Sequence, residues 1–193
     1  SKVASDLKVP EVRFDDELLT SSFTIQDALV SDLVIDFHGG LLEDSVNLVR
    51  VKGNISSIQV TNSFQDALDI DFSDLSIDSI KINDSGNDCI DFSSGNYFVS
   101  KSILIGCADK GISIGERSKA HFESVLIRNA SVALVSKDSS SLNVEEAVVK
   151  DSDLCVAAYR KKQEFAGAQI KIPSNMCNNK KILMQKNSEV LFK

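Results

Sequence analysis

The chain has 193 residues, of which 42% are hydrophobic and 25% are charged, and this composition predicts a single globular domain rather than a disordered segment. Its formal net charge of −7 disfavours nucleic acid and anionic lipid as partners, because their phosphates must be met by Lys and Arg. The sequence contains no run of about 18 apolar residues, so it predicts no membrane-spanning segment. Residues 1–3 do not begin a signal peptide, because no apolar stretch follows them.

The first segment, residues 1–20, carries Pro10 and an acidic stretch at residues 15–17, and it lacks the repeat that begins next. The repeat predicts stacked strands, and the open edge of the first strands would recruit other chains if nothing covered it. We therefore expect residues 1–20 to form an N-terminal cap or the end of a preceding domain.

From residue 21 onward, apolar pairs recur with a step of 22 or 23 residues. Around Leu68 and Ile70 stands the segment QDALDIDF, with the similar EDSVNL 22 residues earlier and NDCIDF 22 residues later. This first ladder comprises Phe23/Ile25, Val46/Leu48, Leu68/Ile70, Ile90/Phe92, Ile112/Ile114, Leu134 and Val156. Self-similarity at a fixed short period indicates a repeat architecture.

Two further apolar ladders keep their own phase. The second comprises Ile35/Phe37, Ile58/Val60, Ile80/Ile82, Ile103/Ile105, Val125/Ile127, Ala147/Val149 and Ile170/Ile172. The third comprises Ile55, Ile77, Val99, Phe122 and Val144. In the two paired ladders the alternation of apolar and other residues is typical of a strand with one buried face.

Three short strands per repeat leave no room for helices, and one such coil cannot bury its apolar face alone. Stacking the coils about 4.8 Å apart pairs each strand with those above and below. The sequence thus predicts an all-β fold, a right-handed single-stranded parallel β-helix of about seven 22–23-residue coils over residues 21–172, with terminal caps. Leucine-rich repeats, propeller blades and antiparallel sandwiches fit the period less well.

The pattern fails at Pro173, and we expect residues 173–193 to form a C-terminal cap. The four cysteines show neither a CxxC pair nor metal-ligand spacing, which argues against a disulfide scaffold and against zinc. We expect Cys89, Cys107, Cys155 and Cys177 to be small buried apolar residues, and their pairing is left open.

The repeat resembles the pectin-lyase-like superfold, which includes pectate lyases, polygalacturonases and C5-epimerases. Gly86-Asn87-Asp88-Cys89 is similar to the G-D-D-C motif of polygalacturonases, with Asn87 in place of the first Asp, and Gln169-Ile170-Lys171 is similar to their R-I-K element. Their G-H-G histidine has no counterpart in this chain. The resemblance covers residues 21–172 in repeat pattern only, and it implies handling of polysaccharide.

Between the apolar positions of the first ladder stand Asp69 and Asp71, and Asp91 follows one coil later. Asp69 and Asp91 are expected to be stacking neighbours about 5–7 Å apart. At this distance, one carboxylate can raise the pKa of the other, or the two can share a calcium ion. The alternative is plain solvation, since exposed acidic residues deter aggregation without any ligand.

Towards the C-terminal coils the same face gains Lys110, Lys137, Tyr159 and Lys161. An acidic band beside cations and a tyrosine is a reasonable groove for a sugar chain, since Tyr stacks on sugar rings and charged groups bind hydroxyls or carboxylates. Surface charge at turns is the alternative. Asp44, Asp66 and Asp88, which precede the same strand in successive coils, are expected to close turns.

Three functions follow from these observations. The first is a polysaccharide-binding or display module, part of a larger surface or secreted protein, whose partner is a polysaccharide or cell-surface glycan and whose location is extracellular, cell-surface or periplasmic. The second is a carbohydrate-active enzyme, a lyase, epimerase or glycoside hydrolase using the Asp and Lys side chains. The third is a structural spacer or spike segment, for which the face would show no change of sign. No organic cofactor is expected, and the oligomeric state is left open.

Overall fold

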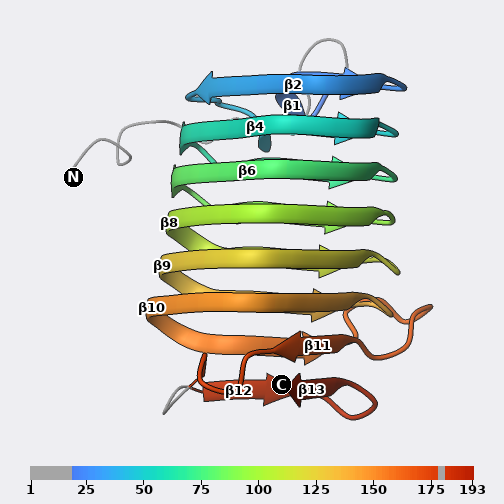
Figure 1. Ribbon diagram of the computed structural model, residues 1–193, viewed down its shortest axis with the longest axis vertical. Coiled ribbons are helices and arrows are strands. Elements are labelled where there is room, and N and C mark those ends of the chain that lie inside the picture. Colours follow the sequence, from blue (N-terminus) through green and yellow to red (C-terminus); the bar gives the residue numbers. More distant parts are fainter. Residues whose placement is uncertain (1–18, 178–180) are drawn as a thin grey trace.

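A computed structural model describes residues 19–177 and 181–193 (Figure 1), and in this part of the chain all regular structure is β-strand. The strands are β1 (Ser21–Gln26), β2 (Leu29–His38), β3 (Asp44–Val49), β4 (Lys52–Ser63), β5 (Asp66–Asp71), β6 (Asp74–Ser85), β7 (Ile90–Ser93), β8 (Asn96–Gly115), β9 (Lys119–Lys137), β10 (Ser141–Tyr159), β11 (Gln169–Ile172), β12 (Lys181–Met184) and β13 (Glu189–Phe192). Nearly all of the expected N-terminal cap, residues 1–18, lies outside the described residues.

Every described strand pairs in parallel with a strand one turn away along the chain. One series runs β1-β3-β5-β7-β8-β9-β10-β11-β13 and a second runs β2-β4-β6-β8, while β12 pairs with β10. The chain therefore forms a parallel β-solenoid of about 8 turns with coils of about 22 residues, stacked from β2 at the top of Figure 1 to β12 and β13 at the bottom. The predicted fold class is confirmed, with one turn more than the expected seven.

The first ladder forms a continuous column through the core. Its register runs Phe23, Val46, Leu68, Ile90, Ile112, Leu134, Val156 and Ile182. The members from Val46 to Val156 are fully buried, because each is covered above and below by a residue of the same kind. The third ladder is confirmed in the same way, as Ile55, Ile77, Val99, Phe122 and Val144 pair in register.

The second ladder is wrong at two places. In β8 the column holds Ser102 and Leu104 instead of Ile103 and Ile105. The extra residue that lengthens this coil from 22 to 23 residues lies in the bend at residues 116–118, after the column position and not before it. The apolar run 103–105 fits either phase, so the pattern alone did not decide.

At the C-terminal end, Ile170 pairs with Leu142 and so belongs with the third ladder rather than the second. The loop of residues 160–168 between β10 and β11 is longer than the bends of the earlier coils. Because of this added length, residues 170–172 reach only the position of the third ladder, at the start of the coil, and not that of the second ladder.

Asn, Asp and Gly residues occur in register at one corner of the solenoid. Asn62, Asp84, Gly106, Asn129 and Asp151 all have left-handed backbone, with φ between 53° and 74°. Asn and Asp tolerate this conformation better than other non-glycine residues. The corner therefore turns in the same way in five successive coils.

The cysteines were correctly expected to be buried, but they are not separate apolar residues. Disulfides join Cys89 to Cys107 and Cys155 to Cys177, with sequence separations of 18 and 22 and Cα–Cα distances of 5.3 and 5.8 Å. Separations close to one coil length bring each pair onto neighbouring turns. After Pro173, β12 and β13 continue the parallel pairing, so residues 181–193 extend the solenoid.

Candidate functional site

A groove of about 500 Å³ follows the outward face of β3, β5 and β7 and reaches β8 and β9. We call it the acidic groove. It is lined by Thr20, Glu43, Asp44, Asn47, Asp66, Asp69, Asp71, Asn87, Asp88, Asp91, Ser93, Lys110, Glu116, Lys137 and Lys161. Asn47, Asp69, Asp71, Asp91 and Ser93 alternate with the core columns, so the spacing that buries the first ladder also directs them outward.

Asp69 lies near the centre of the groove, in register between Asn47 on β3 and Asp91 on β7. Its carboxylate accepts a hydrogen bond of 3.3 Å from the side-chain amide of Asn47. Asp71 lies two residues further along the same strand and is likewise half-buried. The structure thus brings together Asp69, Asp71 and Asp91, but in a recess rather than on an open solvated face.

Burial and crowding raise the pKa values of these carboxyls. Loss of solvent is the main cause at Asp44, Asp66 and Asp71, each with a pKa of about 6. The pKa of Asp69 is raised well above its usual value, first by burial and then by the charges of Asp71 and Asp44. These carboxyl groups therefore gain or lose protons near neutral pH.

Lys137 crosses two coils to meet the acidic row. Its ammonium lies 3.2 Å from Asp91 Oδ2 and donates a 2.9 Å hydrogen bond to Ser113 Oγ. Only 7% of Lys137 is exposed, and burial opposes its charge while Asp91 raises its pKa. The predicted change of sign along the face is present, but this lysine already neutralises a carboxylate.

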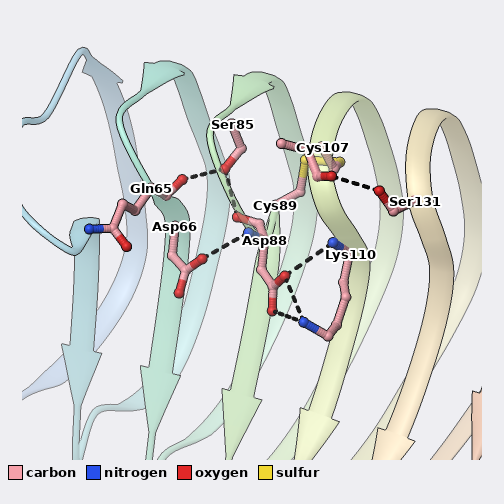
Figure 2. Close-up of a disulfide and its surroundings, with 9 residues drawn as sticks. Gln65, Asp66, Ser85, Asp88, Cys89, Cys107, Lys110 and Ser131 are labelled. Atoms are coloured by element: carbon pink, nitrogen blue, oxygen red, sulfur yellow. Dashed lines mark hydrogen bonds and ion pairs between the residues drawn. A yellow bond between two sulfur atoms is a disulfide. The ribbon is translucent and has the colours of Figure 1, made fainter. Parts of the chain in front are cut away.

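Lys110 makes the corresponding contact one row away, beside the Cys89–Cys107 disulfide (Figure 2). Its ammonium lies 3.2 Å from Asp88 Oδ1 and also pairs with Asp109. Burial nevertheless raises the pKa of Asp88 to about 7. Asp88 also accepts the backbone N–H of Lys110 at 3.1 Å.

The carboxylates expected to close turns also line the acidic groove, which was not predicted from the sequence. Asp66 accepts the backbone N–H of Asp88 at 2.8 Å, a bond between neighbouring coils, as Figure 2 shows. Asp44, Asp66 and Asp88 also line the acidic groove. Their recurrence every 22 residues was the available signal, because equal spacing in a solenoid places side chains in one row.

Of the other two predicted residues, Lys161 lies at the groove and Tyr159 does not. Lys161 lines it, and its backbone N–H donates to Asp138 Oδ1 at 2.6 Å. Tyr159 pairs in register with Lys137 on the neighbouring strand and is half-buried, which raises the pKa of its phenol. Tyr159 does not belong to the groove lining, so sugar stacking on its ring inside the groove is not supported.

The groove does not fit a calcium ion shared by Asp69 and Asp91, which the sequence left as one alternative. Calcium takes six to eight oxygen ligands, whereas Asp91 already faces the ammonium of Lys137 and Asp69 faces the amide N–H of Asn47. Among residues 19–177 and 181–193, no three His, Cys, Asp or Glu side chains are grouped so that they could hold a metal ion.

The two segments similar to polygalacturonase motifs lie apart. Asp88 is in the acidic groove, while Gln169 and Lys171 are on β11 and do not line it.

No protein-family model, no curated protein and no solved structure matches this chain. In the part of the chain that the structure describes, no helix is long and apolar enough to cross a membrane.

Proposed function

We propose that the chain is a carbohydrate-binding or display module and that the acidic groove binds the glycan. The observation that carries the proposal is a recess of about 500 Å³ that is lined by residues with hydrogen-bonding side chains. Sugar hydroxyls both donate and accept hydrogen bonds. Carboxyl groups with pKa values of about 6 supply acceptors and, when protonated, donors.

The charge of the groove favours neutral glycans or amino sugars over uronates. Eight carboxyl side chains line it against three lysines. Two of these lysines, Lys110 and Lys137, already pair with Asp88 and Asp91. A uronate chain would therefore meet excess negative charge, whereas hydroxyl and ammonium groups would find acceptors.

A second candidate, glycoside hydrolysis, has one observation in its favour. A general acid must still hold its proton near neutral pH, and burial raises the pKa of Asp88 to about 7. The lyase and epimerase versions are less well supported, because two of the three lysines that would neutralise a uronate, Lys110 and Lys137, are already paired. A plain spacer would not need the change from carboxylates to lysines along one face.

Two features support the wider assignment. The three apolar ladders that recur with the coil length are the basis for proposing a relationship to the pectin-lyase-like superfold. The disulfides Cys89–Cys107 and Cys155–Cys177 favour an oxidising location such as the cell surface or the periplasm.

A glycan array tests the proposal directly. Wild type is compared with the double variant Asp69→Asn/Asp71→Asn, which keeps the side-chain shape and removes two carboxyl groups from the groove. Asp78→Asn, an exposed position on β6, is the matched control. We expect wild type and the control to bind neutral or amino-sugar glycans and the double variant to lose binding at least about tenfold, the effect of one or two lost charged hydrogen bonds.

Binding by no glycan, or equal binding by the double variant, would contradict the proposal. Release of reducing ends from a bound glycan would favour the hydrolase instead.

A further inference from the structure

A second pocket, of about 520 Å³, shares no lining residue with the acidic groove. It lies between the long loop of residues 160–168, which follows β10, and the turn of residues 185–188, which joins β12 to β13. Figure 1 shows both segments at the same edge of the stack. We call it the basic pocket, and its lining includes Arg160, Glu164, Phe165, Gln185, Lys186 and Asn187. Its volume lies in the range of about 300–1,000 Å³ that is usual for small-molecule sites.

The long loop that forms one wall of the basic pocket is fixed to the solenoid by hydrogen bonds. The fully buried carboxylate of Asp138 accepts the backbone N–H groups of Lys161 and Lys162 at 2.6 and 2.7 Å. Ser139 Oγ accepts the backbone N–H of Ala166 at 2.8 Å. These bonds hold the loop near both of its ends, so the residues between them form a defined wall.

The turn of residues 185–188 forms the facing wall, and it contacts the loop directly. The backbone N–H of Arg160 donates a 2.7 Å hydrogen bond to Gln185 Oε1. Gly167 lies so close to the turn that a Cβ at this position would be 1.8 Å from the backbone oxygen of Asn187. A glycine is therefore required where the two walls meet. The pocket is preformed, as small-molecule sites usually are.

The surroundings of the basic pocket carry positive charge, although the chain as a whole is acidic. Residues 160–193 contain eight Lys or Arg and two Glu, in a chain whose formal net charge is −7. Arg160 and Lys186 line the pocket, and neither has an ion-pair partner among the described residues. Glu164 is the one acidic residue in the lining that the structure describes. Two cations without a counter-charge favour the binding of an anion.

The lining also offers an aromatic ring and two amides. The Phe165 side chain is half-buried, and the guanidinium of Arg117 lies over its ring, 5.4 Å from the centroid. An aromatic ring held in this way supports the apolar face of a sugar ring. The side-chain amides of Gln185 and Asn187 supply hydrogen-bonding groups for hydroxyls. Cations, an aromatic ring and amides together fit a sugar that carries an acid group.

We propose that the basic pocket binds an acidic sugar, whose carboxylate or sulfate group pairs with Arg160 and Lys186 while its ring packs on Phe165. A carboxylate or a sulfate presents two oxygen atoms to the parallel N–H groups of a guanidinium. The excess of carboxylates in the acidic groove would repel the same ligand, so the two sites take different sugar units. The proposal does not depend on glycan binding in the acidic groove.

Isothermal titration calorimetry of the full chain at low salt tests the inference. The two acidic ligands are glucuronate and glucose 6-sulfate, and the comparison ligands are glucose and inorganic sulfate. We expect at least one acidic sugar to bind at one site per chain. Glucose and inorganic sulfate should each bind at least about tenfold more weakly than that sugar, because one lacks the charge and the other lacks the ring.

Three variants of the lining and one control locate the site. Arg160→Gln and Lys186→Gln should each weaken binding of the acidic sugar at least about tenfold, the effect of one lost charged hydrogen bond. Glu164→Gln should strengthen binding, because it removes the carboxylate from the lining. Lys101→Gln, at an exposed position of β8, is the matched control and should bind as wild type does. Melting temperatures identify any variant that has lost its fold, and each lining variant tests the site without the other two.

Four results would overturn the inference. The first is a wild-type protein that binds neither acidic sugar. The second is binding of glucose or inorganic sulfate as tight as that of the acidic sugars. The third is equal binding by the double variant Arg160→Gln/Lys186→Gln. The fourth is loss of binding in Asp69→Asn/Asp71→Asn, which would place the ligand in the acidic groove; if the basic pocket is the site, this variant binds the acidic sugar as wild type does.

Discussion

Replacing Lys137 with methionine removes an ammonium group that lies inside the solenoid wall, while the aliphatic part of the side chain keeps its packing. At the 3.2 Å separation from Asp91 Oδ2, two unit charges attract by about 5 kcal/mol at an effective dielectric constant of about 20. Desolvation of both groups offsets part of this. Breaking a buried pair by removing one partner usually destabilises by about 3–5 kcal/mol.

The Asp91 side chain retains 23% exposure, so we expect the lower part of that range, a loss of about 3 kcal/mol. For a chain of this size the melting temperature should fall by about 6–12 °C. Urea unfolding followed by circular dichroism measures the free-energy change directly. The double variant Lys137→Met/Asp91→Asn should recover more than half of it, because no uncompensated carboxylate is then left.

Lys162→Met is the matched control, since Lys162 pairs with Glu116 at a more exposed position, with 44% of its side chain accessible. Its loss should change stability by at most about 1 kcal/mol. If Lys137→Met behaved like this control, or if Asp91→Asn failed to rescue it, the assignment of Lys137 as the buried counter-charge of the acidic row would be refuted.

Three further predictions follow from the structure. Asp69→Asn should raise the melting temperature at about pH 8 and change it much less at about pH 5, because burial and the neighbouring carboxylates raise the pKa of Asp69 and make its charged form unfavourable in the folded state. Asp44, Asp66 and Asp71 have pKa values of about 6, so the stability of wild type should fall as pH rises through about 6, which melting curves across pH will show. Cys155→Ala/Cys177→Ala should lower the free energy of unfolding by about 3 kcal/mol, the entropy of a closed loop of this length, and reductant should then have a smaller effect than on wild type. Leu104→Ala should lose about 3 kcal/mol and Ile103→Ala clearly less, because Leu104 is fully buried in the column and Ile103 is not; equal losses in urea unfolding would contradict the register.

The sequence predicted the fold because inward residues of a solenoid repeat at the coil length. The column from Phe23 to Val156 was therefore visible as a ladder, and so was the row that unites Asp69 with Asp91. The sequence could not decide whether Ile103 or Leu104 points into the core, since adjacent apolar residues fit either phase and the deciding bend follows only at the end of β8. Ser102 is buried in the same column, but as a polar residue it could not be predicted as a core position from the apolar pattern.

Much of the groove was beyond sequence reasoning for a different reason. Whether a lysine points into solvent or back across two coils depends on side-chain conformation, so the pairing of Lys137 with Asp91 could not be predicted. The disulfides were missed because the cysteines follow no compact motif, although Cys155 and Cys177 are one coil apart. That spacing should be weighed in any solenoid sequence.

The proposed glycan-binding role is tested most directly by mapping a ligand on the protein. Amide signals are assigned by NMR and followed during titration with the glycan that binds best on the array. We expect shifts concentrated at Asp69, Asp71, Asp91 and their neighbours on β3, β5 and β7, with little change on the exposed face of β4 and β6. Shifts confined to that other face, or none with any glycan, would contradict the assignment of the acidic groove as the binding site.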